Sequence, residues 1–381
     1  MTVDRVIHSV RLVDDGTTTD AAWVAFDQGR VAAIGGGDAW RALAPRAEFD
    51  GRGASLTPGF IDIHGHGGGG FSYDDGPDAV AAARALHRAH GTTRAVISLV
   101  TAPVPDLLTR VAWVAELAES DATILGAHLE GPFLAPAHPG AHAADLLREP
   151  DAALDALLEA GRGSVRQVTI APELPGGLDA VHRIVAAGAV AAVGHTAADF
   201  DTARRAFGAG ASVLTHAFNA MPGIHHRAPG PVVAAFEDER VTLELVADGA
   251  HVDPPVMRLA VGAAPGRIAL VTDAMAAAGT GDGMYRLGSL DVEVTGGVAR
   301  LSADGTMAGS TLTQDAAVRR VVQECGMPLP AAIAAVSAVP ARAIGRLDLG
   351  RLAPGSPADA VLLSDELEVQ AVWVDGEPVR R

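Results

Sequence analysis

Eight short apolar runs, separated by alanine-rich stretches, constrain the fold of this chain more than any other feature. The stretches 78–91, 106–120 and 176–188 have the spacing of amphipathic helices and alternate with runs of strand length. Such alternation predicts a parallel sheet, and eight strands are the number that closes a (β/α)8 TIM-like barrel. An open, doubly wound sheet is the alternative that periodicity leaves open. The eight runs are FIDIHGH, RAVISLVT, TILGAHLEGP, RQVTIAPE, AVAAVGHT, SVLTHAFN, TLELVADGAH and IALVTDAM.

Both ends of the chain follow a different pattern. The first fifty residues alternate between apolar and polar positions and are broken by Asp-Gly, Gly-Gly and Pro-Gly turns, which predicts an antiparallel β unit without helices. The last thirty residues are similar, with a hairpin turn expected at Asp375 and Gly376. We therefore expect the two ends to pair into one small β-sandwich domain, residues 1–56 and 347–381, beside a barrel domain, residues 57–346.

Composition excludes several classes of function. All 29 basic residues are arginine, so the chain has no lysine for a pyridoxal Schiff base or a P-loop. A net charge of −17 disfavours nucleic acid and anionic membranes, and predicts neither as a partner. The charged N-terminus does not resemble a signal peptide, and the single Cys325 suits a reducing compartment, so a cytoplasmic location is expected.

Polar and titratable residues follow nearly every predicted barrel strand. In FIDIHGHGGGG, Asp62, His64 and His66 would share one face of a strand, because alternate side chains point the same way. The carboxyl ends of barrel strands converge on one mouth, where active sites are built. The strand-end residues expected to meet there are His64, His66, Thr101, Glu130, Glu173, His195, His216, Asp248 with His251, and Asp273.

The candidate metal ligands exceed what one ion needs. Four imidazoles and two carboxylates are too many for a single four-coordinate catalytic zinc. They predict either one divalent metal with additional groups or two ions that share a carboxylate, with Glu130 as the candidate bridge. His128 would support this site as a neighbour of a ligand, whereas the helical His87, His90 and His182 are expected at the surface. The candidate ligands are His64, His66, Glu130, His195, His216 and Asp273.

Five motifs together carry a resemblance to a known family. PGFIDIHGH, HLEGPF, VGHT, LTHAFNAM and VTDAM resemble the amidohydrolase superfamily and, within it, the N-acetylglucosamine-6-phosphate deacetylase family. The resemblance covers nearly the whole chain, including the split β domain. His-x-His marks the superfamily broadly, whereas HLEGP with THAFNAM is typical of this deacetylase family. Many superfamily members bridge two metals with a carbamylated lysine, and the lack of lysine here excludes dihydroorotase-like and hydantoinase-like functions.

The resemblance implies a role for each candidate residue. Glu130, His195 and His216 match the principal metal ligands, and Asp273 matches the catalytic aspartate. His64 and His66 match a variant that can hold a second ion. His142 would polarise the acetyl carbonyl. The residues expected to contact the sugar phosphate are Ala141, His142, Asn219, Ala220, Arg227, His251 and Met307.

The implied reaction is metal-dependent hydrolysis of the N-acetyl amide of N-acetylglucosamine 6-phosphate, with Asp273 as general base and then general acid. Zinc is the first expectation for the metal, with iron, cobalt or manganese as alternatives. Other readings are a deacylase of N-acetylgalactosamine 6-phosphate or of an N-acyl amino acid, or a non-catalytic scaffold. The loop of Arg227 can reach a neighbouring subunit in this family, so a homodimer is expected. The glycines 67–70 would let the chain leave the crowded mouth, and a phosphate cradle is the alternative for them.

Overall fold

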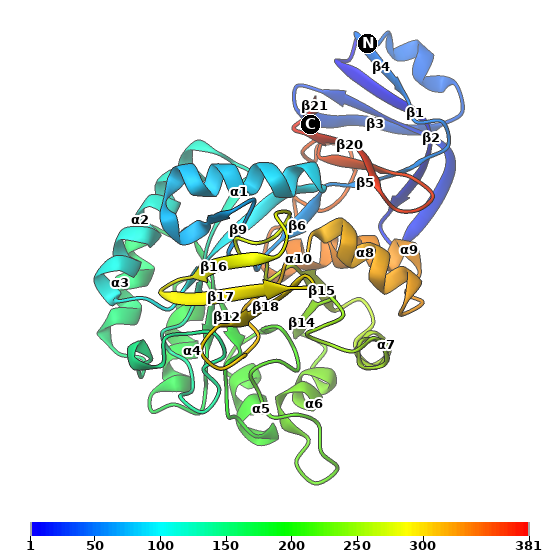
Figure 1. Ribbon diagram of the computed structural model, residues 1–381. Coiled ribbons are helices and arrows are strands. Elements are labelled where there is room, and N and C mark those ends of the chain that lie inside the picture. Colours follow the sequence, from blue (N-terminus) through cyan, green and yellow to red (C-terminus); the bar gives the residue numbers. More distant parts are fainter. Residues whose placement is uncertain (1, 380–381) are drawn as a thin grey trace.

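The eight predicted barrel strands form one sheet of parallel neighbours in the computed structural model, which describes residues 2–379 (Figure 1). Their order is β15-β14-β13-β12-β11-β10-β9-β6, so strands that follow one another along the chain lie side by side. The strands are β6 (Phe60–Asp62), β9 (Thr92–Val100), β10 (Ile124–Glu130), β11 (Val165–Ile170), β12 (Val190–Val193), β13 (Val213–Leu214), β14 (Thr242–Val246) and β15 (Ile268–Val271).

The barrel closes between its first and last strands. The Thr272 hydroxyl donates to Asp62 Oδ2 at 2.6 Å, the Asp273 N–H donates to the His64 carbonyl at 2.8 Å, and the His66 N–H donates to the Ala274 carbonyl at 2.7 Å. These bonds join the segments that follow β6 and β15. The structure is therefore a nearly closed barrel and not an open, doubly wound sheet.

Helices cover the outside of the barrel and bury apolar side chains against it (Figure 1). Local signals explain where several of them begin: α1 follows Gly76 with Pro77 at its first turn, and the Asp199 carboxylate accepts from the Thr202 N–H at the start of α5. The helices are α1 (Pro77–Ala89), α2 (Val104–Ser120), α3 (Ala152–Ala160), α4 (Gly177–Ala186), α5 (Phe200–Gly208), α6 (Gly230–Glu237), α7 (Pro254–Ala263), α8 (Gln314–Gln323), α9 (Leu329–Ala335) and α10 (Ala338–Ala343), with 3-10 turns η1 (Ala39–Leu43), η2 (Tyr73–Asp75) and η3 (Ala144–Leu146).

The two ends of the chain build a second, smaller domain beside the barrel, where both termini lie (Figure 1). Its strands are β1 (Arg5–Asp14), β2 (Thr17–Asp27), β3 (Arg30–Gly36), β4 (Ala47–Asp50), β5 (Ser55–Pro58), β19 (Ala360–Leu363), β20 (Val369–Val374) and β21 (Glu377–Pro378). Two parts of the expectation were wrong. β4 and β5 pair in parallel, not antiparallel, with successive parts of the long strand β1. In addition, η1 adds a helical turn. The predicted domain boundaries stay predictions.

A buried ion pair joins the two domains. Arg94 on β9 donates through Nε to Asp359 Oδ2 at 2.6 Å and through Nη2 to Asp375 Oδ1 at 2.7 Å. The Arg94 and Asp359 side chains are almost inaccessible to solvent. The guanidinium therefore ties the barrel to both ends of the β19–β20 hairpin.

A three-stranded antiparallel sheet interrupts the barrel after β15. β16 (Gly283–Leu287), β17 (Leu290–Thr295) and β18 (Val298–Leu301) cross the face of the barrel nearest the viewer in Figure 1. These residues were expected in the barrel domain, and their sheet was not predicted. Its strands are antiparallel and only 4 to 6 residues long, and only the fold shows where they pack.

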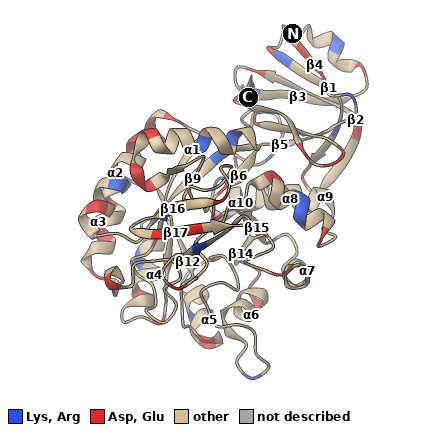
Figure 2. Cartoon of the chain, in the orientation of Figure 1, with Lys and Arg blue, Asp and Glu red and all other residues tan. Residues whose placement is uncertain are grey.

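Acidic and basic residues are interspersed over the outer helices of the barrel in the view of Figure 2. Among residues 2–379, no helix is both long enough and apolar enough to cross a membrane.

Candidate metal centre and active site

Two groups of three side chains could each hold a metal ion at the mouth of the barrel. One comprises His64, His66 and Asp273, and the other comprises Glu130, His195 and His216. All six residues are buried. They are the six candidate ligands selected from the sequence, and the ends of the barrel strands bring them together.

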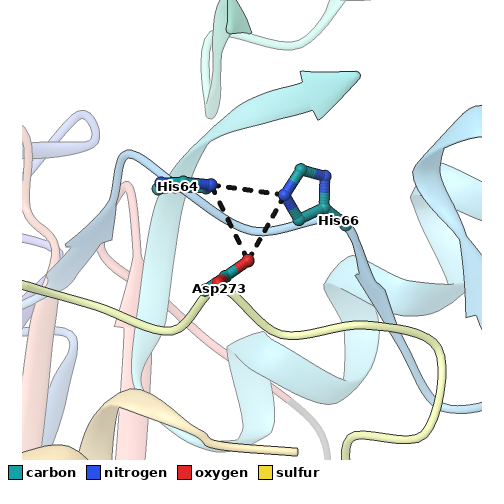
Figure 3. A group of neighbouring side chains, drawn as sticks. All are labelled: His64, His66 and Asp273. Carbon is teal, nitrogen blue, oxygen red and sulfur yellow. Dashed lines mark hydrogen bonds and ion pairs between the residues drawn. The ribbon is translucent and has the colours of Figure 1, made fainter. Parts of the chain in front are cut away.

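The first group joins the two ends of the barrel sheet (Figure 3). His64 and His66 lie in the segment after β6, and Asp273 lies just after β15. Asp273 Oδ1 is 3.4 Å from His66 Nε2 and 3.7 Å from His64 Nε2, and the two Nε2 atoms are 3.3 Å apart. The strand β6 ends at Asp62, so the two histidines follow the strand and do not extend it as the sequence suggested. They still converge on one point.

The second group is as compact as the first. His195 Nε2 and His216 Nε2 are each 3.1 Å from Glu130 Oε1 and 2.9 Å from one another. Glu130 also faces the first group, because its Oε2 is 3.0 Å from His66 Nε2 and its Oε1 is 3.3 Å from His64 Nε2. A carboxylate with an oxygen toward each group has the geometry of a bridging ligand.

The donor set fits divalent metal ions. Ligand atoms about 2.0–2.2 Å from a common tetrahedral ion lie roughly 3.3–3.6 Å apart, close to the separations found here. In each group, two imidazole nitrogens and a carboxylate oxygen lie close together. A shared cation would accept a lone pair from each of the three. The distal nitrogens of two rings are also held: His64 Nδ1 bonds Glu244 at 2.9 Å, and His195 Nδ1 donates to the His138 carbonyl at 3.1 Å. Such contacts leave Nε2 free to ligate.

Three of the six ligands have a left-handed backbone. The φ angles of His195, His216 and Asp273 are +45°, +26° and +49°. Non-glycine residues seldom adopt this region, and such strain is concentrated at functional sites. The turn directs each side chain into the mouth directly after its strand ends.

Burial and neighbouring charges shift the pKa values of the ligand side chains strongly. Burial raises the pKa of Glu130, but the charge of His64 and hydrogen bonds from His142, His195 and His216 outweigh it and hold that pKa well below its usual value. Burial likewise raises the pKa of Asp273, and its hydrogen bond to His66 reverses the shift. Burial lowers the pKa of His66, but Asp273 and Glu130 raise it to about 9. Both carboxylates are therefore ionised at neutral pH and available to cations.

A second layer of buried polar side chains surrounds the ligands. His128 bonds the hydroxyls of Ser98 at 2.9 Å and Thr169 at 2.8 Å, and lies behind His64 as a neighbour and not as a ligand. Burial, followed by the charge of His64, holds the pKa of His128 well below its usual value. Glu244 also contacts His64, and sequence reasoning missed it because Glu244 lies in the interior of β14, two residues before that strand ends.

A cavity of about 440 Å³ opens beside the ligands. It is lined by six of the seven residues expected to contact substrate, which are Ala141, His142, Asn219, Ala220, His251 and Met307. Its wall also includes His138, Leu287, Asp304 and Thr306, which the sequence analysis did not select. Leu287, Asp304 and Thr306 belong to the inserted sheet and the loop after it, where only the neighbouring Met307 was expected from the sequence.

Arg227 lies apart from this cavity within a single chain. It sits in an exposed loop between β13 and α6, where its N–H donates to His225 Nδ1 at 3.3 Å. Arg227, which was expected to contact the sugar phosphate, therefore does not line the cavity of its own chain.

Other residues singled out in the sequence have structural partners. Glu173 accepts from the Thr196 hydroxyl at 2.5 Å, and Asp248 Oδ2 bonds His251 Nδ1 at 2.7 Å. Thr101 donates to the Glu130 carbonyl at 3.3 Å. Cys325 is buried after α8, as expected for a packing residue.

The expectation that His87 is at the surface was wrong, and the glycine run explains why. Residues 67–72 form a hairpin of β7 (Gly67–Gly68) and β8 (Phe71–Ser72), with φ angles of +63° and +90° at Gly69 and Gly70. A β-carbon on Gly68 would lie 2.8 Å from His87 Nε2, so the hairpin packs closely against α1. The buried His87 Nε2 donates to the Gly67 carbonyl at 2.8 Å. The glycines thus make a tight turn away from the metal centre.

Comparison with known proteins agrees with this geometry. The model of the amidohydrolase family matches residues 55–379. An N-acetylgalactosamine-6-phosphate deacetylase from Escherichia coli is 43% identical over 84% of this chain and 87% of the relative. An N-acetylglucosamine-6-phosphate deacetylase from Homo sapiens is 37% identical over 86% of this chain and 84% of the relative.

A solved structure resembles the whole molecule. It is an N-acetyl-D-glucosamine-6-phosphate deacetylase from Mycobacterium smegmatis, in which one aspartate is replaced by alanine, in complex with N-acetyl-D-glucosamine-6-phosphate. It is 43% identical, has a TM-score of 0.95 and matches 100% of both chains.

Proposed function

This chain belongs to the amidohydrolase family, and from that premise we propose that it hydrolyses the N-acetyl amide of N-acetylglucosamine 6-phosphate to glucosamine 6-phosphate and acetate. The observation that carries this proposal is the pair of buried ligand groups joined by Glu130 beside a cavity of about 440 Å³. Relatives named as deacetylases of this sugar phosphate, or of its galactosamine counterpart, support the substrate class.

The family is metal-dependent, and the six ligands would hold one or two divalent ions. When bound, such an ion lowers the pKa of coordinated water to about 7 and polarises an amide carbonyl. We propose zinc first, with iron, cobalt or manganese as alternatives, because nitrogen and carboxylate ligands suit all four.

Asp273 is the proposed general base and acid. Its carboxylate lines the cavity and lies 3.4 Å from His66 Nε2, so it is placed to accept the proton of the attacking water. The same group then protonates the departing sugar nitrogen, which would otherwise leave as an unstable amide anion.

His142 is placed to stabilise the oxyanion that forms at the acetyl carbonyl. The Thr101 N–H donates to His142 Nδ1 at 3.4 Å, so the ring proton of a neutral His142 lies on Nε2. That nitrogen is 3.5 Å from Glu130 Oε2 and lies at the cavity wall. A hydrogen bond from a donor fixed at this position becomes stronger as negative charge develops on the substrate oxygen.

The remaining cavity residues are proposed to bind the sugar phosphate. Burial lowers the pKa of His251, but Asp248 outweighs burial and raises it, which favours a cationic ring toward an anionic substrate. Asn219, Ala220 and Met307 offer polar and apolar contacts around the same cavity.

The test is acetate release from N-acetylglucosamine 6-phosphate by the purified, metal-loaded enzyme. The unphosphorylated sugar serves as the control, and we expect kcat/KM to fall at least about a hundredfold when the phosphate is absent, because charge-assisted hydrogen bonds contribute roughly 1.5–3 kcal/mol each. No release from any N-acetylated sugar phosphate would refute the proposal and favour a non-catalytic scaffold.

A second candidate substrate is N-acetylgalactosamine 6-phosphate, favoured by the 43% identical Escherichia coli relative. The ratio of kcat/KM for the two epimers, measured on one preparation, decides between them. The other alternative substrate, an N-acyl amino acid, carries no phosphate. Its hydrolysis by the same preparation would favour that alternative.

We also propose that the enzyme is a homodimer in which Arg227 of one subunit reaches the substrate phosphate of the other. The exposure of its loop and its absence from the cavity of its own chain support this arrangement. The cytoplasmic location expected from the sequence stays a prediction.

A further inference from the structure

Glu244 is a carboxylate in the barrel interior to which the reaction assigns no task. It lies on β14, and its exposed fraction is 0%. Gln167 Nε2 donates to its Oε1 at 2.7 Å, His64 Nδ1 bonds its Oε2 at 2.9 Å, and the His216 backbone N–H donates to that same oxygen at 3.2 Å. Glu244 thus contacts one residue from each candidate ligand group.

We propose that Glu244 is a positioning residue that sets the orientation and ring tautomer of His64, and thereby determines how tightly the group of His64, His66 and Asp273 holds its ion. The inference rests on the proposed function only in requiring a metal centre, and it concerns a residue outside both ligand groups.

Two carboxylates, Glu130 and Glu244, compete for the ring proton of His64. A neutral imidazole has a single ring proton, and only the nitrogen without it can ligate a metal. His64 Nδ1 is 2.9 Å from Glu244 Oε2, whereas His64 Nε2 is 3.3 Å from Glu130 Oε1. A ring that ligates an ion is neutral, and the shorter contact makes Glu244 the better acceptor for its one proton, on Nδ1. The lone pair of Nε2 then points toward His66 and Asp273, where an ion would bind.

No other ligand histidine has this arrangement. The distal Nδ1 of His195 bonds a backbone carbonyl, and among residues 2–379 the Nδ1 atoms of His66 and His216 have no hydrogen-bond partner. His64 is therefore the ligand whose two ring nitrogens face different carboxylates. Without Glu244, Glu130 would attract the ring proton to Nε2 and block ligation.

Packing does not explain a glutamate at this position. All five residues of β14 are buried, and a buried ionised carboxylate costs several kcal/mol unless donors surround it. An apolar side chain would fill the space without that cost. The three donors of Glu244 are what a fixed acceptor for His64 requires.

Three variants test the role. Glu244→Met keeps the approximate volume and removes the acceptor. Glu244→Gln removes the charge but can keep an acceptor toward His64, because Gln167 Oε1 has no partner among residues 2–379 and can turn toward the new amide. Gln167→Met is the matched control, because it removes the Glu244 contact that does not involve a ligand.

The measurement is a zinc titration of each purified protein against a competing chelator, followed by ¹⁵N NMR of the histidine rings. The His64 and His195 signals report the two ions separately and show which ring nitrogen carries the proton. We expect zinc at the His64 group to bind about 10–100-fold more weakly in Glu244→Met, and less weakly but in the same direction in Glu244→Gln. In Glu244→Met the His64 proton should move to Nε2, and Gln167→Met should change the affinity less than about threefold.

Unchanged affinity and tautomer in Glu244→Gln and Glu244→Met would overturn the proposal, as would an equal loss in Gln167→Met, which would assign the effect to packing of the barrel. If Glu244→Met does not fold, Glu244→Gln decides alone, because a purely structural role predicts no change of affinity at the His64 group. No substrate enters this experiment, so a failure to deacetylate sugar phosphates leaves its result intact.

Discussion

At the scale of single residues, the proposed chemistry depends most on the position of Asp273. Its carboxylate lies 3.4 Å from His66 Nε2 and also lines the cavity, so one side chain faces both the histidines of its own group and the substrate space. A ligand that is also accessible to substrate can move a proton between water and the leaving nitrogen. The other five candidate ligands have no comparable second task in the proposed reaction.

The first prediction concerns Asp273→Asn. The amide has the size of the carboxylate but cannot accept and return a proton, so kcat should fall at least about a thousandfold while the sugar phosphate still binds. Steady-state kinetics and calorimetric titration with N-acetylglucosamine 6-phosphate measure the two effects. Asp304→Asn, which changes another aspartate of the cavity wall, should alter kcat less than about tenfold. Near-normal turnover by Asp273→Asn would refute the assignment.

The second prediction concerns the number of ions. Replacing His64 and His66 together with asparagine removes two of the three ligands of the first group. Metal content should fall from about two equivalents toward one, because Glu130, His195 and His216 remain for the second ion. Activity should decrease without vanishing, mainly in kcat.

Elemental analysis beside kinetics checks this result. The control is His87→Asn, a buried histidine outside both groups, whose metal content should equal that of the unchanged protein. One equivalent of metal in both the unchanged protein and the double variant would show that the first group holds no ion.

At the scale of elements, the segments at the ends of helices and strands position the side chains of the candidate site. β6 and β15 come together through bonds between their following segments, and this closure sets His64 beside Asp273. The start of α8 anchors the wall of the same barrel. There Asp315, in the first turn, accepts from the Thr313 hydroxyl at 2.6 Å and pairs with His90 at 3.1 Å and Arg319 at 3.0 Å.

The third prediction follows from the pKa of Asp315. Burial raises it, but hydrogen bonds from His90 and Thr313 outweigh burial and lower it from 3.8 to about 2. A depressed carboxyl pKa stabilises the folded state above the unfolded pKa, and this contribution is lost as the pH falls through the folded pKa. Asp315→Asn should therefore lower the free energy of unfolding by about 2 kcal/mol at pH 7, and the difference should roughly halve by pH 3.

Urea denaturation of both proteins at pH 7, 4 and 3 measures that difference. Asp106→Asn is the control, because Asp106 also occupies the first turn of a helix but is exposed, and it should change stability by less than about 0.5 kcal/mol. A difference between Asp315→Asn and the unchanged protein that does not vary with pH would contradict the prediction.

At the scale of the whole molecule, the proposed homodimer would add a cationic side chain to the cavity. Among residues 2–379, the cavity walls contain histidines and aspartates but no arginine, whereas Arg227 lies exposed on its loop. A dianionic phosphate is best bound by a guanidinium, which can donate two parallel hydrogen bonds. A second subunit would supply that group.

The fourth prediction tests this arrangement. Arg227→Gln should raise KM for the phosphorylated substrate about 10–100-fold and leave kcat nearly unchanged, because a charge-assisted hydrogen bond contributes roughly 1.5–3 kcal/mol. Arg240→Gln, at another exposed arginine, is the control and should leave both constants unchanged.

Mixed dimers show whether Arg227 acts between subunits. In a dimer of one Arg227→Gln chain and one Asp273→Asn chain, the first chain keeps Asp273 and would receive Arg227 from the second. Activity with a normal KM should therefore return on mixing. If KM stays raised, Arg227 acts within its own chain or not at all on the phosphate.

The number of barrel strands, the split terminal domain and the six candidate ligands could all be predicted from the residues alone. These features are local: periodicity reports which residues of a strand are buried, and the side chain itself decides whether a group can bind a metal or transfer a proton. His64, His195 and Asp273 could be selected from their strand ends without knowing any distance between them.

Which of these groups lie next to one another depends on the tertiary structure. Glu130 faces both ligand groups only because the closed barrel brings residues far apart in the chain within about 3 Å of its oxygens. The burial of His87 depends on the glycine hairpin packed against α1, and the contact of Glu244 with His64 joins β14 to the segment after β6. The inserted sheet adds Leu287 to the cavity wall. Such contacts depend on the closure and packing of the whole barrel, which no local pattern of residues encodes.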